Sequence, residues 1–394
     1  LLVASANPST SSRDRELSLH EWSAAMRRLK IAPDIRGLVG AKGFYGSASS
    51  KSYTLMGSFS LYLIERYGMD TYLKAYPRAD FEGAYGRSVD QLVGEWEVFI
   101  DGLELQAEVL PLAEFYFDRK SIFTKVCART IAALRDEGRD LLARQRTEAA
   151  LSCYRQIVTF NPKSASYRLQ LVAALRKAKR LDEALDEAHT LLEAESIPSV
   201  RRAEALRERG DLGWLRGEWE AAEADYRDAL SRPLPWATRR GLAARLEALA
   251  APDREGGTRA LAQSYLLSQD RSRALYDVTR WAHLAPGSGL ANYLVGRQLW
   301  SRYACSEAIG WLERALAAEQ RPLPDTTLTV EAQRLLGICR LTQRDWEGAR
   351  EAFKAIVAAE LPEGIRAQAR EWLERVAWEQ AVWEQAASGQ ERTP

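Results

Sequence analysis

Small residues recur along this chain at intervals of about 34 residues, and this period restricts the possible folds more than any other feature of the sequence. The pattern is clearest in three stretches, where a glycine, an alanine and an aromatic residue follow one another in the same order. These residues are Gly138, Ala150 and Tyr154; Gly210, Ala222 and Tyr226; and Gly337, Ala349 and Phe353. The period predicts an array of about six repeated units, each made of two antiparallel helices.

The other units keep part of the pattern. The second unit, around residues 164–197, keeps Ala184, and the fourth, around residues 255–286, keeps Ala274. The fifth unit supplies Gly296, Ala308 and Ala315. Small side chains at these positions let the two helices of a unit approach closely. A single unit cannot bury its apolar stripe alone, so stacked units are expected to share a core and to form a superhelix with a concave inner face.

The spacing resembles that of the tetratricopeptide repeat family over roughly residues 122–362. The resemblance implies an all-α fold, in which a solenoid of about six helix pairs occupies residues 131–362. In that family the first helix of each pair lines the concave groove, and the groove holds a protein or peptide partner. The chain is therefore expected to be a protein–protein interaction scaffold that needs no cofactor.

The geometry of that family places a basic and aromatic set of residues on or near the groove. The set is Arg135, Arg139, Arg176, Arg207, Trp214, Arg259, Tyr293, Arg297, Trp300 and Arg334. Guanidinium groups pair with carboxylates and stack on rings, so this surface would suit an acidic peptide. The alternative interpretation is that the arginines form a solvated helix face and that Trp214 and Trp300 belong to the core. The asparagine-containing carboxylate clamp of some family members is not found at the corresponding positions.

A different helical domain is predicted at residues 16–105, where glycine and tyrosine become frequent. We expect helices at 52–67, 69–76 and 88–100, the last one capped by Ser88 together with Gln91. Residues 1–15 have the composition of a linker, which would join this domain to a longer parent protein. A linker helix is predicted at 106–130, a capping helix at 363–386 and a frayed tail at 387–394.

The stretches YTLMGSFSLYLIERYG and DFEGAYGRSVDQLVGEWEVFID resemble the C-terminal helical part of gluzincin, or peptidase MA-like, zinc metallopeptidases. Members of that family bind zinc through an HExxH helix and a later glutamate. This chain has no such motif, because the sequence that begins at His20 has Ala24 where the second histidine would stand. The resemblance leaves Tyr53 as a weak candidate for an oxyanion-stabilising residue. His20 is expected to be a packing or surface residue.

Composition excludes several other classes of function. The chain has 55 Lys and Arg residues against 54 Asp and Glu residues. A net charge of +1 is too small to attract the whole molecule to nucleic acid. The cysteines Cys127, Cys153, Cys305 and Cys339 are far apart and the chain has only three histidines, so no metal site is predicted. Each cysteine is expected to be a small buried residue. No apolar run is long enough for a membrane span.

Two functions from different classes remain. The first is the interaction scaffold, without catalysis by this chain. The second is the C-terminal, substrate-selecting part of a zinc metallopeptidase whose HExxH core would lie upstream of Leu1. The high content of arginine and alanine is typical of a GC-rich bacterial genome, and family analogy favours the bacterial cell envelope, although the residues themselves do not identify a compartment.

Overall fold

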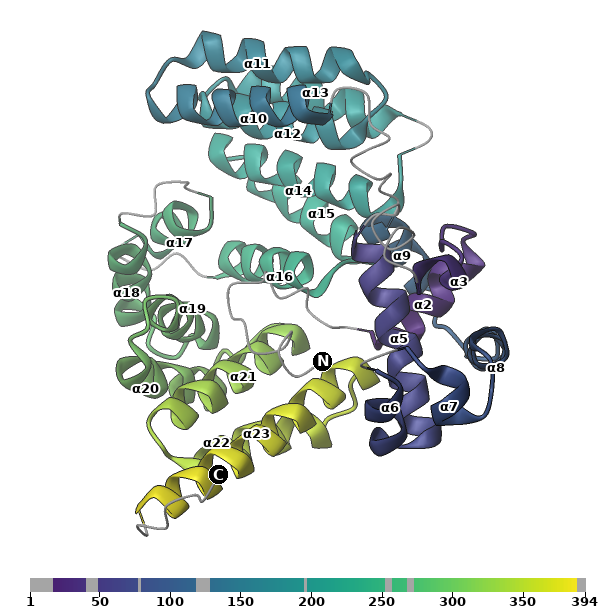
Figure 1. The fold of residues 1–394 in the computed structure, drawn as a ribbon. Helices are drawn as coiled ribbons and strands as arrows, with labels where there is room; N and C mark the ends of the chain where they lie inside the picture. The colour runs from purple at the N-terminus through teal and green to yellow at the C-terminus, as the bar shows by residue number, and fades with distance from the viewer. Residues whose placement is uncertain are drawn as a thin grey trace. The chain divides into compact units, whose positions relative to one another are not determined.

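The computed structural model describes residues 17–387, apart from 40–48, 77–78, 118–127, 195–196, 252–256 and 268–272. Almost all the described residues lie in α-helices or in the turns between them (Figure 1), and none of them forms a strand. The chain divides into two compact units, residues 1–167 with 198–201 and residues 168–197 with 202–394. The predicted linker at 1–15, residues 118–127 of the predicted linker helix and residues 388–394 of the tail lie outside the described residues.

The first unit contains seven described helices before the repeats and one helix pair. These are α2 (Leu19–Arg28), α3 (Ile35–Leu38), α5 (Ser49–Tyr67), α6 (Met69–Ala75), α7 (Phe81–Tyr85), α8 (Val89–Asp101), α9 (Val109–Phe117), α10 (Ala128–Ala143) and α11 (Thr147–Phe160). The predicted helices at 52–67, 69–76 and 88–100 correspond to α5, α6 and α8. The capping box of Ser88 and Gln91 is confirmed, since each side chain accepts a hydrogen bond from the other residue's backbone amide.

Helices α2, α5, α8 and α9 of the first unit surround a core built on Trp96 and Phe59. These two rings meet edge to face, with their centroids 6.1 Å apart. The indole N–H of Trp96 would be costly to bury without an acceptor, and it donates to the hydroxyl of Ser58 at 3.0 Å. Helix α9 contributes Val109 and Phe117 to the same core, so this part of the predicted linker helix packs against the helices that precede it.

The second unit contains the other helices of the array. They are α12 (Ala165–Lys177), α13 (Leu181–Glu193), α14 (Ser199–Arg216), α15 (Trp219–Leu230), α16 (Trp236–Ala250), α17 (Thr258–Leu267), α18 (Ala274–Leu284), α19 (Gly289–Trp300), α20 (Cys305–Leu316), α21 (Thr326–Thr342), α22 (Trp346–Ala358) and α23 (Glu363–Ala387). Together with α10 and α11 they give six helix pairs, one single helix, α16, and the terminal helix α23. The all-α solenoid predicted from the sequence is therefore the observed fold.

Five of the helix pairs are joined by the same turn. In each turn one residue adopts a left-handed conformation, with φ between 59° and 80°. The amide of the following residue donates to the carbonyl five positions earlier at 2.9–3.1 Å, which is the hydrogen bond of a Schellman cap. The left-handed residues are Gln145, Lys179, Gly217, Tyr303 and Arg344. A repeated turn gives successive pairs a similar local geometry.

The glycine of the repeat pattern is the point where the two helices of a pair come closest. A Cβ atom added to Gly210 would lie 2.6 Å from a ring carbon of Tyr226. The same close approach occurs between Gly138 and Tyr154, and between Gly337 and Phe353. In the fifth unit Gly296 meets Leu312, which fills the place of the aromatic ring. These contacts explain why the pattern combines a glycine with a large residue.

We expect Gly210→Ala to destabilise the second unit by about 1–3 kcal/mol, because the methyl group enters a well-packed core. The Tyr226 ring cannot move away easily, since its hydroxyl donates to Asp211 at 2.8 Å. Chemical denaturation followed by circular dichroism measures the change. The matched control is Gly310→Ala, where the added methyl group meets only the far end of Arg314 at 3.8 Å. The control should be neutral or slightly stabilising, and equal losses for both variants would contradict this account.

Candidate interaction surface

The ten predicted groove residues fall in both units, so they do not form one described surface. Arg135 and Arg139 lie on α10 in the first unit, where both are exposed and Arg139 pairs with Asp136 of its own helix. The other eight lie in the second unit, on α12, α14, α17, α19 and α21. The candidate surface is therefore assembled here from the second unit alone.

Two of the predicted groove residues are core residues, and for these two the prediction is wrong. Trp214 is 1% exposed and Tyr293 is 2% exposed, and both belong to the large hydrophobic core of the second unit. Each points between neighbouring helices, where its ring fills space that a smaller residue would leave open. A ligand on the surface cannot reach them. The alternative interpretation given for Trp214 from the sequence is the one that its burial supports.

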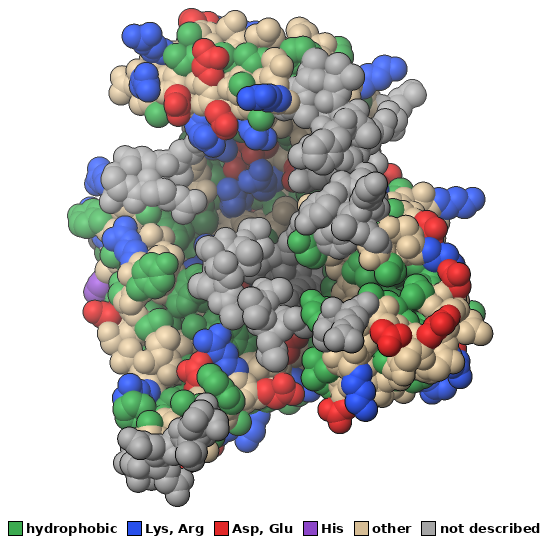
Figure 2. Space-filling view, viewed as in Figure 1, with side chains coloured by type: hydrophobic (Ala, Val, Ile, Leu, Met, Phe, Trp, Pro, Cys, Tyr) green, Lys and Arg blue, Asp and Glu red, His purple; other side chains and the backbone are tan. Residues whose placement is uncertain are grey.

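Arg176 and Arg207 converge on one buried carboxylate, that of Glu208. The Nε of Arg176 donates to Glu208 at 3.1 Å, and a guanidinium nitrogen of Arg207 donates to the other carboxylate oxygen at 2.7 Å. Arg176 also donates to the backbone carbonyl of Leu267 at the end of α17. Figure 2 shows basic side chains beside acidic ones in the hollow near α14. These two arginines therefore connect α12, α14 and α17 and are already partnered.

Helix α16 adds a second buried ion pair that the repeat period did not predict. Arg245 donates through Nε and one terminal nitrogen to the two carboxylate oxygens of Asp211, at 2.7 and 3.2 Å. Asp211 is 0% exposed, and the hydroxyl of Tyr226 donates to it as well. Burial alone would raise the pKa of Asp211, but the charges of Arg245 and Arg207 hold it below its usual range. This side of α14 is thus covered by α16.

A third cluster lies on α16, α19 and α21, and it contains more arginine than carboxylate. Arg334 makes a bidentate pair with Glu331 on the same helix, through Nε at 3.1 Å and one terminal nitrogen at 3.0 Å. Burial acts to raise the pKa of Glu331, but Arg334, Arg240 and Arg297 outweigh it and keep the pKa low. We call Arg240, Arg297, Glu331 and Arg334 the arginine cluster.

Arg297 is the most accessible member of the arginine cluster. Its side chain is exposed and makes no ion pair with any residue in the part of the chain that the structure describes. Interaction with the neighbouring Tyr293 phenol raises the pKa of Arg297, so its guanidinium stays charged. The ring of Trp300 lies beside the cluster, with the guanidinium carbon of Arg334 at 5.9 Å from the ring centroid. An exposed charged donor beside an aromatic ring is suited to binding a carboxylate.

The remaining predicted groove residue, Arg259, is stacked on an indole ring. Its guanidinium carbon lies 4.3 Å from the ring centroid of Trp219, the first residue of α15. The contact joins α17 to α15, which is the second helix of its pair. Arg259 is therefore already engaged with an aromatic ring of its own unit, and the candidate surface is defined without it.

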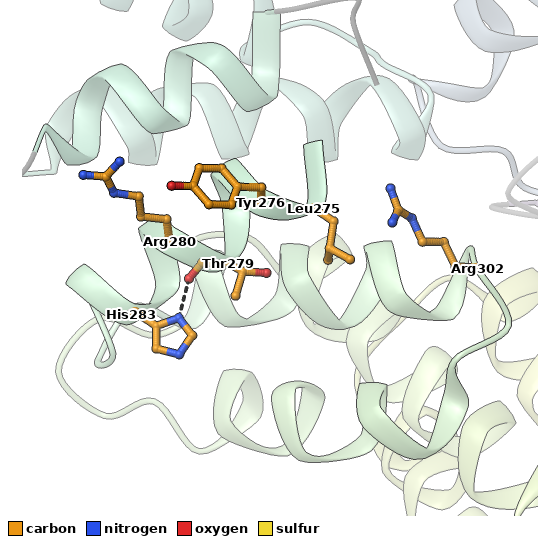
Figure 3. A pocket seen from close by; sticks show the side chains of 6 residues that line it. All are labelled: Leu275, Tyr276, Thr279, Arg280, His283 and Arg302. Atoms are coloured by element: carbon orange, nitrogen blue, oxygen red, sulfur yellow. Dashed lines mark hydrogen bonds between the residues drawn. The ribbon is translucent and has the colours of Figure 1, made fainter. Parts of the chain in front are cut away.

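A shallow, open depression lies over α18 (Figure 3). Its lining residues are Leu275, Tyr276, Thr279, Arg280, His283 and Arg302. The imidazole of His283 is close to its own helix, with Nδ1 at 2.7 Å from the carbonyl oxygen of Thr279, and its ring meets Trp311 edge to face. The histidine that lines the depression is therefore engaged in local contacts. The six lining residues do not include a nucleophile paired with a general base.

The residues singled out in the first unit have separate surroundings. His20 is nearly buried, with Nδ1 at 2.8 Å from Ser58 Oγ and Nε2 at 3.3 Å from Glu65. Ser58 is fully buried, so this Glu–His–Ser arrangement has no accessible nucleophile. Tyr53 is 68% exposed on α5. No group of three or more metal-ligating side chains occurs among the described residues, and the metallopeptidase resemblance of this unit stays a prediction.

His20 should titrate at a pH below the ordinary histidine value of about 6.5. Burial lowers its pKa, and the charge and hydrogen bond of Glu65 offset only part of that effect. The unfolded chain then binds this proton more readily than the folded chain, so the stability of the first unit should fall as the pH drops below about 6.5. An NMR titration of the imidazole protons measures the midpoint, with His20→Gln for assignment. A midpoint at or above 6.5 would show the prediction to be wrong.

We expect Asp211→Ala to destabilise the second unit by about 3–5 kcal/mol, because it leaves the buried charge of Arg245 unpaired. The control is Asp182→Ala, which removes an exposed partner of Arg216 and should change stability by less than about 1 kcal/mol. The double variant Asp211→Leu with Arg245→Met should recover much of the loss, since it removes both charges. Thermal and urea denaturation measure all three, and a double variant no more stable than Asp211→Ala would contradict the ionic explanation.

Comparison with known proteins adds a family match to this geometry. Two segments of the chain, residues 135–194 and 305–365, match the family model described as "Tetratricopeptide repeat". A search of curated proteins finds no match. Within the described residues, no helix has both the length and the apolar character needed to cross a membrane.

Several solved structures are similar to this chain at low identity. The MamA protein is 15% identical, with 48% of this chain and 92% of that chain covered and a TM-score of 0.27. The TPR2AB domain of yeast Sti1 in complex with pHSP90 is 16% identical, with 63% and 99% covered and a TM-score of 0.26. YrrB, described as a TPR protein with an unusual peptide-binding site, is 17% identical, with 55% and 97% covered and a TM-score of 0.24. At these scores they carry no functional argument.

Proposed function

We propose that the tetratricopeptide repeats of this chain bind a peptide segment of a protein partner, and that an acidic side chain of the peptide pairs with Arg297. The observation that carries the proposal is the exposed guanidinium of Arg297, which has no ion-pair partner among the described residues and lies beside Arg240, Arg334 and the carboxylate of Glu331. Charge-assisted hydrogen bonds to a carboxylate are stronger than neutral ones. The chain would therefore act as an interaction scaffold.

The proposed position of this site is supported by the ion pairs that the other arginines already make. Arg176 and Arg207 are paired with Glu208, and Arg245 is paired with Asp211. A ligand carboxylate would have to displace a buried internal partner to reach them, which leaves that partner's charge uncompensated. Arg297 has no ion-pair partner to displace in the part of the second unit that the structure describes. This difference favours α19 and α21 over α12 and α14 as the recognition surface.

Trp300 supports the same location. It is partly buried on α19, one helical turn after Arg297, and packs against the core of the second unit. A large ring at the edge of a charged site supplies apolar contact at a low conformational entropy cost. A peptide with a carboxylate and a neighbouring apolar residue would fit this surface. No described contact favours the alternative function as the substrate-selecting part of a zinc peptidase.

The test begins with a displayed library of random 12-residue peptides, selected against the whole chain. Selected peptides are then synthesised with a fluorophore, and each is compared with a copy in which Asp and Glu are replaced by Asn and Gln. Fluorescence anisotropy should show tighter binding of the acidic copy, and the difference should shrink at high salt because exposed charges are screened. Equal affinities for both copies would contradict the acidic preference.

We expect Arg297→Ala to weaken binding of the acidic peptide by about tenfold or more, since a hydrogen bond to a charged group contributes about 1.5–3 kcal/mol. The matched control is Arg227→Ala, which removes an exposed arginine from α15, the second helix of its pair. The control should change affinity less than about twofold. Similar losses in both variants would show that net charge and not this site governs binding.

A further inference from the structure

Two cysteines of the second unit lie side by side although they are far apart in the sequence. Cys305 is the first residue of α20, and Cys339 lies in α21. The thiol of Cys339 donates to the sulfur of Cys305, and the two Sγ atoms are 2.7 Å apart. A disulfide bond has a length of about 2.05 Å. The sulfur atoms therefore need to move by less than about 1 Å to reach bonding distance.

The two thiols differ in accessibility. Cys339 is 0% exposed and belongs to the large core of the second unit, whereas Cys305 is only partly buried. Burial and the hydrogen bond to Cys305 raise the pKa of Cys339, so its thiol keeps its proton. A reagent from solution can thus reach Cys305 first. Cys153, the other described cysteine, is buried on α11 in the first unit.

We propose that Cys305 and Cys339 form a thiol–disulfide exchange site that accepts a small disulfide, such as oxidised glutathione, and closes into an intramolecular disulfide. In the first step the Cys305 thiolate attacks one sulfur of the small disulfide, which forms a mixed disulfide and releases one thiol. Cys339 then transfers its proton to the thiolate expelled in the first step and attacks the Cys305 sulfur, and the second small thiol leaves as a thiolate that takes up the proton Cys305 had lost. Two protein thiols are oxidised, and one small disulfide is reduced to two thiols.

The bond would connect two successive helix pairs, α19–α20 and α21–α22. These helices already pack against each other, since Cys339 and Leu312 of α20 belong to one core. A cross-link between elements that are in contact in the folded state restricts the unfolded chain and distorts the folded one little. Oxidation should therefore stabilise this part of the solenoid and leave its fold unchanged. This inference does not depend on peptide binding.

The experiment incubates the native full-length chain with oxidised glutathione, blocks remaining thiols with iodoacetamide, and maps tryptic peptides by mass spectrometry. The expected product is a cross-link between peptides 303–314 and 335–340 that disappears after reduction. Cys153→Ser should retain the cross-link, and Cys305→Ser and Cys339→Ser should each abolish it. Circular dichroism confirms that the variants are folded.

Two results of this experiment would overturn the proposal. One is a stable glutathione adduct on Cys305 without the cross-link, which would mean that Cys339 cannot reach the mixed disulfide. The other is full alkylation of both cysteines after incubation.

A second measurement is the melting temperature of the wild-type chain, which should rise by several degrees on oxidation but stay constant in Cys305→Ser. An unchanged or lower value in the wild type would show that the native geometry is not poised for the bond.

Discussion

Arg245 brings two guanidinium N–H groups to the carboxylate of Asp211 in the interior of the second unit, and this buried pair fixes a helix that does not belong to any repeat. The same arginine donates to the carbonyl of Leu266 at the end of α17. Helix α16 therefore connects α14 with α17. At its other side, Glu247 pairs with Arg321, just before α21. Because the charges are compensated only in this arrangement, the position of α16 is tightly specified.

Ion pairs within the second unit also determine which of its arginines are available to a binding partner. Most arginines on α12, α14 and α21 have acidic neighbours from within the unit, so the surface is less basic than its arginine content indicates. Arg297 differs because α19 offers it no carboxylate within reach among the described residues. Under the proposed function, specificity would thus arise from Arg297, whose charge has no carboxylate partner among the described residues, and not from a uniformly basic groove.

The sequence predicted the helix pairs well because the two helices of a pair come closest at Gly210, where the ring of Tyr226 leaves no room for a Cβ atom. The equivalent glycines of other units meet the same requirement. The sequence did not predict α16, which interrupts the period and whose polar residues find their partners on distant helices. The burial of Tyr293 was not predicted, and that of Trp214 was predicted only as an alternative, because burial depends on how each helix is rotated about its own axis. Likewise, ion pairs such as Arg176 with Glu208 join residues whose proximity only the packed structure defines.

The left-handed turn between paired helices has a consequence for how such an array can vary. At all five turns the left-handed residue is exposed, and four of the five are not glycine. Its side chain contributes little to the core, while its backbone sets the path of the chain. Whereas Arg344 stacks on Trp383 of α23, Gln145, Lys179 and Tyr303 thus mark surface positions where chemistry can change with little effect on packing. A fluorophore or cross-linker attached there would report on the array without altering it.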